Sequence, residues 1–245
     1  MTAFFRLGVC VLGFFFLIFP VSCFSESLKF ISLEVAPWSY SSEKNERYKG
    51  VFPDVVKEIE RRTGHHIEIT MTSFSFERID RELKLGRQDC AIVIEDEVRN
   101  EYVILGETLF EHSMGVVARR GLILHEYSDL YGYVISTNKK ITISDKFVAD
   151  KKIKKVFDVD YRIGLRKIKH GRIDAVAGAI PTIEYLANQE GMSDLLGDPL
   201  ILKMQPVSLQ CSKNSKKIRF MDSINQAIKS MKKDGTLSKI MASNF

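Results

Sequence analysis

The side chain with the clearest chemical use is Arg99, which follows the apolar run 91–94 near the expected end of a strand. A guanidinium can hold a carboxylate through two parallel hydrogen bonds, so Arg99 predicts an anion contact. A solvated surface arginine among Glu95, Asp96 and Glu97 is the alternative. The five histidines and four cysteines show no HExxH or CxxC spacing, and no GxGxxG or GxxxxGK string occurs. Neither a metal nor any cofactor is therefore predicted.

Three residues near the expected end of the first strand are further ligand candidates. Trp38 is the only tryptophan, and its ring can stack on an apolar or cationic ligand; packing in a core is the alternative. Glu34 is a carboxylate in the otherwise apolar run 31–35, and a charge there is costly unless it faces a cleft or a partner. Tyr40 is placed to reach the rim of such a cleft.

A second set of candidates lies further along the chain. Arg78 stands at the start of an expected helix, where a cation opposes the helix dipole unless an anion lies nearby. We therefore predict Arg78 as a second anion contact. Ser113 and Ser136, near expected strand or hinge ends, are hydroxyl candidates. No nucleophile–base pair is recognisable among these groups, so catalysis is not predicted.

The first 25 residues have the pattern of a cleaved secretory signal peptide. Arg6 is their only charge, an apolar run follows, and small residues close the segment. The alternative is a retained membrane helix, which needs about 20 apolar residues. Cys23, preceded by Val and Ser, also matches a lipoprotein signal loosely, in which case this cysteine would carry a lipid anchor. We predict export to the periplasm.

The cysteines outside this segment are Cys90 and Cys211. An exported protein meets an oxidising compartment, where a disulfide between them is conceivable. Each of them, however, lies in an apolar stretch, and a buried free thiol is the commoner outcome there. We therefore expect free thiols at both positions.

Composition narrows the class of partner. Lys and Arg number 36 against 31 Asp and Glu, and the formal net charge is +5. A charge this small does not provide the dense basic face that nucleic-acid binding needs. Apolar residues make up 45% of the chain, which is enough to bury a core and excludes a wholly disordered chain.

The chain after the N-terminal segment repeats one order of elements: strand, helix, strand, helix, strand. The first copy is expected over 28–35, 53–62, 66–71, 76–86 and 91–94, and the second over 131–136, 145–150, 153–157, 161–169 and 175–179. A K-x-G-R-x-D string links the second helix to the third strand in both copies. We assign it a structural role, because glycine caps helices and basic residues suit their C-terminal ends.

Two such units predict an α/β chain of two lobes with a ligand cleft between them. An extended segment (200–211) and late helices (218–231, 237–241) return to the first lobe, so the chain crosses between lobes near 116–120 and near 204–208. The expected domains are a signal peptide over 1–25, lobe 1 over 26–117 plus 209–245, and lobe 2 over 118–208. Ligands bind where the carboxyl ends of strands face such a crevice.

These segments, in this order, resemble the bacterial extracellular solute-binding proteins of family three, whose type members are the periplasmic amino-acid-binding proteins of ABC importers. The strings that carry the resemblance are APWSY (36–40), GVFPD (50–54), FER (76–78) with Leu83, Gly86 and Asp89, then Arg99, and GRIDA (171–175). The resemblance implies a two-lobed, type II periplasmic-binding fold that closes on a small solute by hinge motion. It also implies that Arg99 binds the carboxylate of the ligand.

Two departures from the family pattern bear on the ligand. The segment between Asp89 and Arg99 is shorter than usual and lacks its Thr-Pro. The family commonly places an aspartate for the ligand's ammonium shortly after the DA of the second lobe, but here no acid follows Asp174 until Glu184. An α-amino acid then needs Glu34 to hold its ammonium. The resemblance therefore implies a small anionic or zwitterionic solute, either an amino acid or an organic acid.

The resemblance further implies a monomeric, non-catalytic protein that delivers its solute to a membrane permease and has no nucleic-acid partner. A ligand sensor that feeds a membrane receptor is an open alternative. Another is a lyase or dehydratase on the same scaffold, with Glu34 or Glu95 as the acid or base.

Overall fold

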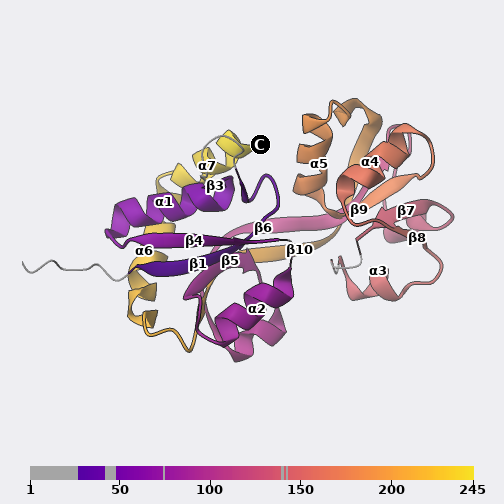
Figure 1. Ribbon diagram of the computed structural model, residues 1–245. Helices are drawn as coiled ribbons and strands as arrows, with labels where there is room; N and C mark the ends of the chain where they lie inside the picture. Colours follow the sequence, from indigo (N-terminus) through magenta and orange to yellow (C-terminus); the bar gives the residue numbers. More distant parts are fainter. Residues whose placement is uncertain (1–26, 42–47, 74, 139–140, 142) are drawn as a thin grey trace, which may run out of the picture.

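The computed structural model describes residues 27–41, 48–73, 75–138, 141 and 143–245, which form two lobes (Figure 1). The expected signal peptide, residues 1–25, and the proposed lipid site at Cys23 lie outside the described residues. None of the helices in the described part of the chain has the length and apolarity to cross a membrane.

The first lobe is built on three parallel strands, β1 (Leu28–Leu33), β4 (Ile67–Thr72) and β5 (Cys90–Ile94), with β1 in the middle. Its helices are α1 (Val51–Thr63), α2 (Phe76–Lys84), α6 (Met221–Lys233) and α7 (Thr236–Asn244). A short ribbon of β2 (Tyr40–Ser41) and β3 (Tyr48–Lys49) precedes α1.

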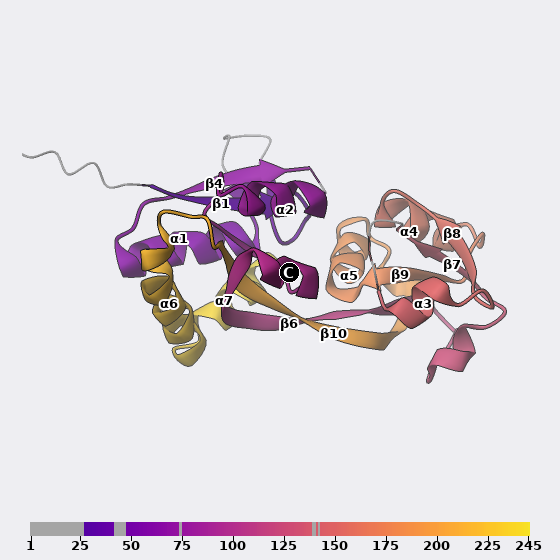
Figure 2. The same ribbon diagram turned by 90° about the horizontal axis from the view of Figure 1, so that it is seen from below.

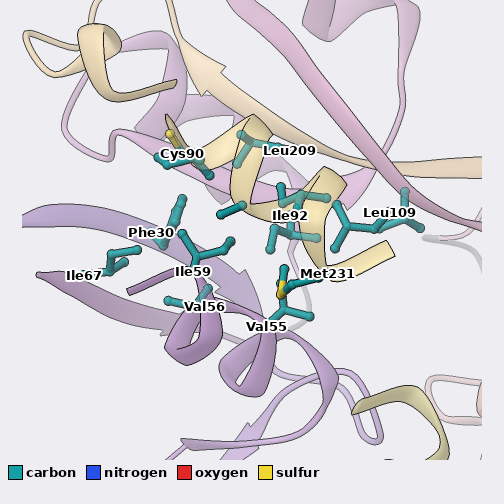
Figure 3. Close-up of a cluster of buried hydrophobic side chains, with 14 of the residues drawn as sticks. Phe30, Val55, Val56, Ile59, Ile67, Cys90, Ile92, Leu109, Leu209 and Met231 are labelled. Carbon is teal, nitrogen blue, oxygen red and sulfur yellow. The ribbon is translucent and has the colours of Figure 1, made fainter. Parts of the chain in front are cut away.

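Both faces of this lobe's sheet are covered. Phe30 of β1 and Ile92 of β5 join a core with α1 and α6, part of which Figure 3 shows. Their neighbours Ile31 and Val93 point to the other face and pack with α2. Successive side chains of a strand alternate between faces, so strands covered on both sides read as uninterrupted apolar runs. The sequence expectation for 91–94 is confirmed.

The second lobe repeats this plan. Its parallel strands are β7 (Val134–Thr137), β8 (Lys154–Phe157) and β9 (Ala175–Ala179), again with the first of the three in the middle. Its helices are α3 (Asp145–Ala149), α4 (Tyr161–Lys169) and α5 (Ile180–Gln189). The doubled strand–helix order is confirmed. Helix α5 was not predicted; Pro181 lies in its first turn, where proline is favoured.

Two long antiparallel strands, β6 (Val103–Arg119) and β10 (Leu196–Ser212), connect the lobes (Figure 2). They complete one eight-stranded sheet in the order β4-β1-β5-β10-β6-β9-β7-β8. On β6, Leu109 packs in the first-lobe core and Met114 in the second; on β10, Leu202 packs in the second and Val207 in the first. We propose that the chain changes lobe over 110–113 and 203–206, a few residues before the expected 116–120 on β6. Short 3₁₀ turns complete the structure at Glu97–Glu101, Tyr127–Leu130, Ser193–Leu195 and Ile218–Phe220.

The expectation of free thiols is wrong. Cys90 and Cys211 form a disulfide, with their Cα atoms 4.0 Å apart. The two residues face each other because β10 returns antiparallel to β5 with Cys211 opposite Cys90. They are 121 residues apart in the sequence, and their apolar surroundings reflect the core that covers the bond.

The repeated K-x-G-R-x-D string does structural work in both lobes, as expected. Asp89 Oδ2 accepts a hydrogen bond of 2.8 Å from the backbone N–H of Lys29, at the start of β1. Asp174 Oδ2 accepts one of 2.9 Å from the N–H of Val134, at the start of β7. Each aspartate thus ties the third strand of its lobe to the first.

Candidate functional site

A cavity of about 260 Å³ lies between the lobes. The first lobe contributes Trp38, Phe52 and Asp80 among other residues, the second contributes Tyr161 and Thr182, and the connecting strands contribute Phe110, His112, Met114, Gln205 and Val207. Most of the lining is apolar. A concave, mostly apolar site with a few converging polar groups is the usual form of a small-molecule site.

Trp38 is positioned by a tight turn after β1. Val35 and Ser39 pair across this turn, with Val35 N–H donating to Ser39 O at 2.7 Å. The turn docks on the start of α1, where the N–H of Phe52 donates to the carbonyl of Trp38 at 2.9 Å. Gly50 is needed at this approach, because a Cβ there would lie 2.6 Å from the Trp38 carbonyl oxygen. The GVFPD string therefore places the tryptophan.

The Trp38 ring joins the two lobes. It is 5% exposed and stacks on Phe110 and Phe52, with ring centroids 5.2 and 5.7 Å away. Its indole Nε1 donates a hydrogen bond of 2.9 Å to Oγ1 of Thr182 on α5, in the second lobe. Trp38 thus packs in the core of the first lobe and also forms part of the cavity wall. The sequence had left these two positions as alternatives, and the residue occupies both.

Arg99 also lines the cavity, but its guanidinium is already engaged. The residue sits on the 3₁₀ turn after β5 with its side chain 2% exposed, so it is not a solvated surface arginine. Nε donates to Asp80 Oδ1 at 2.7 Å. Nη1 donates to the carbonyl of Ile94 at 2.8 Å and to Gln210 Oε1 at 3.2 Å. Asp80 thus already pairs with the charge that a ligand carboxylate was expected to meet.

The charged part of the lining is predominantly acidic. Asp80, Glu95 and Asp96 contribute carboxylates. Arg99 is the one arginine or lysine that the described residues contribute, and it pairs with Asp80. Two acids therefore remain without a paired base in the wall, and the local field favours a cation over an anion.

Two polar side chains face each other on the connecting strands. His112 of β6 is opposite Gln205 of β10 in the antiparallel register, and both line the cavity. They are 7% and 8% exposed. Within the described part of the chain, His112 Nδ1 and Gln205 Oε1 have no hydrogen-bond partner. Burial lowers the pKa of His112 from 6.5 to about 4, so its ring is neutral near pH 7.

A second cavity, of about 300 Å³, adjoins the first and shares Thr182 and Tyr161 with it. Glu34 and Tyr40 lie in its wall, as do Asp160 and Arg162 of the second lobe. Glu34 comes directly after β1 and is exposed, and its Oε1 accepts a hydrogen bond of 2.9 Å from Ser41 Oγ. Its charge is therefore solvated instead of being buried within a strand.

The other three sequence candidates do not line either cavity. Arg78 is exposed on α2. Ser113 is half-buried on β6, next to His112. Ser136 is buried in the second lobe, where its Oγ donates to Asp158 Oδ2 at 2.6 Å. The structure thus brings Trp38 and Arg99 together, and it places Glu34 and Tyr40 at the adjoining cavity.

Sequence reasoning missed Asp80, His112, Thr182 and Gln205. Asp80 is half-buried on α2, next to the buried Ile79, and a carboxylate at such a position was a usable sign of a partner. His112 and Gln205 gave no local signal, because only the pairing of β6 with β10 brings them together. Across the residues that the structure describes, no group of three or more His, Cys, Asp or Glu is arranged to hold a metal ion.

Comparison with known proteins identifies relatives of this arrangement. A family model, "Bacterial extracellular solute-binding proteins, family 3", matches residues 30–245. None of the curated proteins gives a match.

Several solved structures share the fold. An ancestral arginine-binding protein bound to arginine has 23% identity and a TM-score of 0.69, with 89% of this chain and 98% of that chain covered. The GluR0 ligand-binding core from Nostoc punctiforme, in complex with L-glutamate, has 18% identity and a TM-score of 0.71, covering 89% and 99%. The BvgS VFT2 domain of Bordetella pertussis has the same identity and TM-score, covering 89% and 93%. The likeness confirms the expected two-lobed, type II periplasmic-binding fold.

Proposed function

Because the chain belongs to family 3 of the bacterial extracellular solute-binding proteins, we propose that it captures a small solute by hinge closure and delivers it to an ABC-type importer. The observation that carries the proposal is the cavity of about 260 Å³ walled by both lobes and by the two strands that join them. Bending of such connections opens and closes the cavity around a ligand. The protein acts by binding, without catalysis.

The place of action follows from the family and the N-terminal pattern. Family members are extracellular solute-binding proteins, and residues 1–25 have the composition of an export signal. We propose a periplasmic monomer whose ligand-closed form docks on the membrane permease. The N-terminus is processed either at an ordinary signal peptidase site or at Cys23, and the mass of the mature protein distinguishes the two.

The anionic or zwitterionic ligand expected from the sequence depended on a free guanidinium at Arg99. That guanidinium pairs with Asp80 and donates to Ile94 and Gln210. A carboxylate ligand would have to displace Asp80 from this arrangement.

Trp38 provides the assay for solute capture. It is the only tryptophan in the sequence, it lies in the cavity wall, and it contacts both lobes. Its fluorescence is therefore expected to change when a solute enters and the lobes adjust. Amines, amino acids, organic acids and sugars are titrated while Trp38 emission is followed, and X-ray scattering then tests whether the bound form is more compact. Solute capture is refuted if no solute class changes the emission or the melting temperature.

A further inference from the structure

The facing pair His112 and Gln205 is unusual because each carries a buried polar atom that has no partner among the residues described by the structure. Burying such an atom costs stability, and native proteins tolerate it mainly where a water, an ion or a ligand completes the hydrogen bond. Opposite residues on antiparallel strands have Cβ atoms about 5 Å apart, close enough for one ligand group to reach both. The position of the pair on the connecting strands, in the cavity lining, points to a ligand contact.

The two atoms both act as acceptors when His112 carries its proton on Nε2. Gln205 Oε1 is a hydrogen-bond acceptor, and a neutral imidazole with its proton on Nε2 makes His112 Nδ1 an acceptor as well. The lowered pKa of His112 keeps the ring neutral, so it does not repel a cation. Both atoms are covered in this arrangement, and the terminal torsions of histidine and glutamine are broad enough to turn them toward the cavity. The pair is therefore suited to a ligand that donates N–H groups.

The rest of the cavity agrees with a positively charged donor. Glu95 and Asp96 add negative charge to the wall, while the Arg99 charge is balanced by Asp80. The rings of Trp38, Phe52 and Phe110 form an aromatic wall, and aromatic faces attract cations as well as apolar groups. The described lining residues include no unpaired lysine or arginine that could pair with the carboxylate of a ligand.

We propose that this site selects organic amines or amidines with an apolar body and no carboxylate, whose N–H groups donate to His112 Nδ1 and Gln205 Oε1. The inference rests on the proposed solute-binding function and deepens it by naming the ligand class. Glu95 and Asp96 repel the carboxylate that an amino acid or an organic acid carries, and the charge of Arg99 is already paired with Asp80.

Matched probes test the charge of the ligand. Two series keep the apolar body and change the charged group: 2-phenylethylamine, phenylalanine and 3-phenylpropanoate, and pentylamine, norleucine and hexanoate. Calorimetry and Trp38 fluorescence measure their affinities for the full mature protein. We expect at least one amine to bind about tenfold or more tightly than its amino acid, with the carboxylate weakest. Equal or tighter binding of the amino acid or the carboxylate overturns the amine proposal and leaves solute capture supported. Failure of every probe in both series overturns the amine proposal, and if the wider panel also fails, solute capture falls as well.

Variants of the pair test the contacts. Gln205→Leu and His112→Phe keep a similar volume and remove the acceptors, so each should weaken amine binding by about tenfold. Because each also removes an unpartnered buried polar atom, the ligand-free melting temperature should stay constant or rise by about 2–4 °C. Gln189→Leu, at the exposed end of α5, is the matched control and should leave the affinity unchanged. A loss of melting temperature with unchanged amine affinity would assign the pair a purely structural role and refute the proposal.

Discussion

Acidification is expected to destabilise the protein through His112. The pKa of this ring is lowered from 6.5 to about 4 because the surrounding side chains exclude water from the charged form. Its contribution to stability is therefore fully present above pH 6.5. It is lost as the pH falls from 6.5 to 4, since the unfolded chain gains a proton there that the folded protein does not.

The size of the effect follows from the difference in pKa. Each unit is worth 1.36 kcal/mol, so the complete difference corresponds to about 3 kcal/mol. At pH 5.0 the unfolded state is almost fully protonated at this ring and the folded state hardly at all, and the loss relative to pH 7.5 is about 2 kcal/mol. Carboxylates also contribute at low pH, but their effect is common to the wild type and to variants of His112.

Urea unfolding followed by circular dichroism at pH 7.5 and pH 5.0 measures this loss. His112→Phe should reduce the decrease in unfolding free energy between the two pH values by about 2 kcal/mol. His170→Gln, at an exposed position at the end of α4, should keep the wild-type pH dependence. An identical pH dependence in wild type and His112→Phe would show that the folded protein protonates the ring as easily as the unfolded chain, and would refute the reasoning.

Three further changes probe the scaffold of the site. Cys211→Ser removes the disulfide with Cys90, which closes a loop of 121 residues. It should lower the unfolding free energy by about 4 kcal/mol in urea titrations under oxidising conditions, and an unchanged urea midpoint would contradict this. Asp80→Ala leaves the Arg99 guanidinium buried without its carboxylate and should cost about 2 kcal/mol by the same measurement, whereas wild-type stability would mean that other partners suffice. Gly115→Ala would put a Cβ 2.1 Å from a carbonyl oxygen of β10 and should cost about 2 kcal/mol by thermal unfolding; a tolerated alanine would show that the two connecting strands can separate there.

The parts of the fold that local pattern determines were predictable from the sequence. Helix α4 and strand β9 have the predicted bounds. The helix has apolar residues at helical spacing on one face, and the strand is a run of small apolar residues, so each pattern indicates the element and its burial. The doubled order and the two lobes follow from such segments. Strand β6 was not predicted as one element, since it passes from a partly exposed edge into two different cores and its burial pattern has no single period.

The site was less predictable because its contacts join distant segments. Arg99 was recognised, but its pairing with Asp80 depends on how α2 lies against the turn after β5. Trp38 was recognised, while its partner Thr182 lies 144 residues away on a helix of the other lobe. Hydrogen bonds of this kind come from tertiary packing, and no spacing within the chain encodes them.

The discontinuity of the first lobe has a consequence for biogenesis. Residues of the second lobe form one uninterrupted stretch, whereas the first lobe needs β10, α6 and α7 from the far end of the chain. Contacts that span short sequence distances form earliest, so we expect the second lobe to acquire its core first as the polypeptide emerges. Until Cys211 arrives, Cys90 does not have its native partner, and if the chain is exported as proposed, a thiol-trapping time course during translocation should find Cys90 reduced up to that moment.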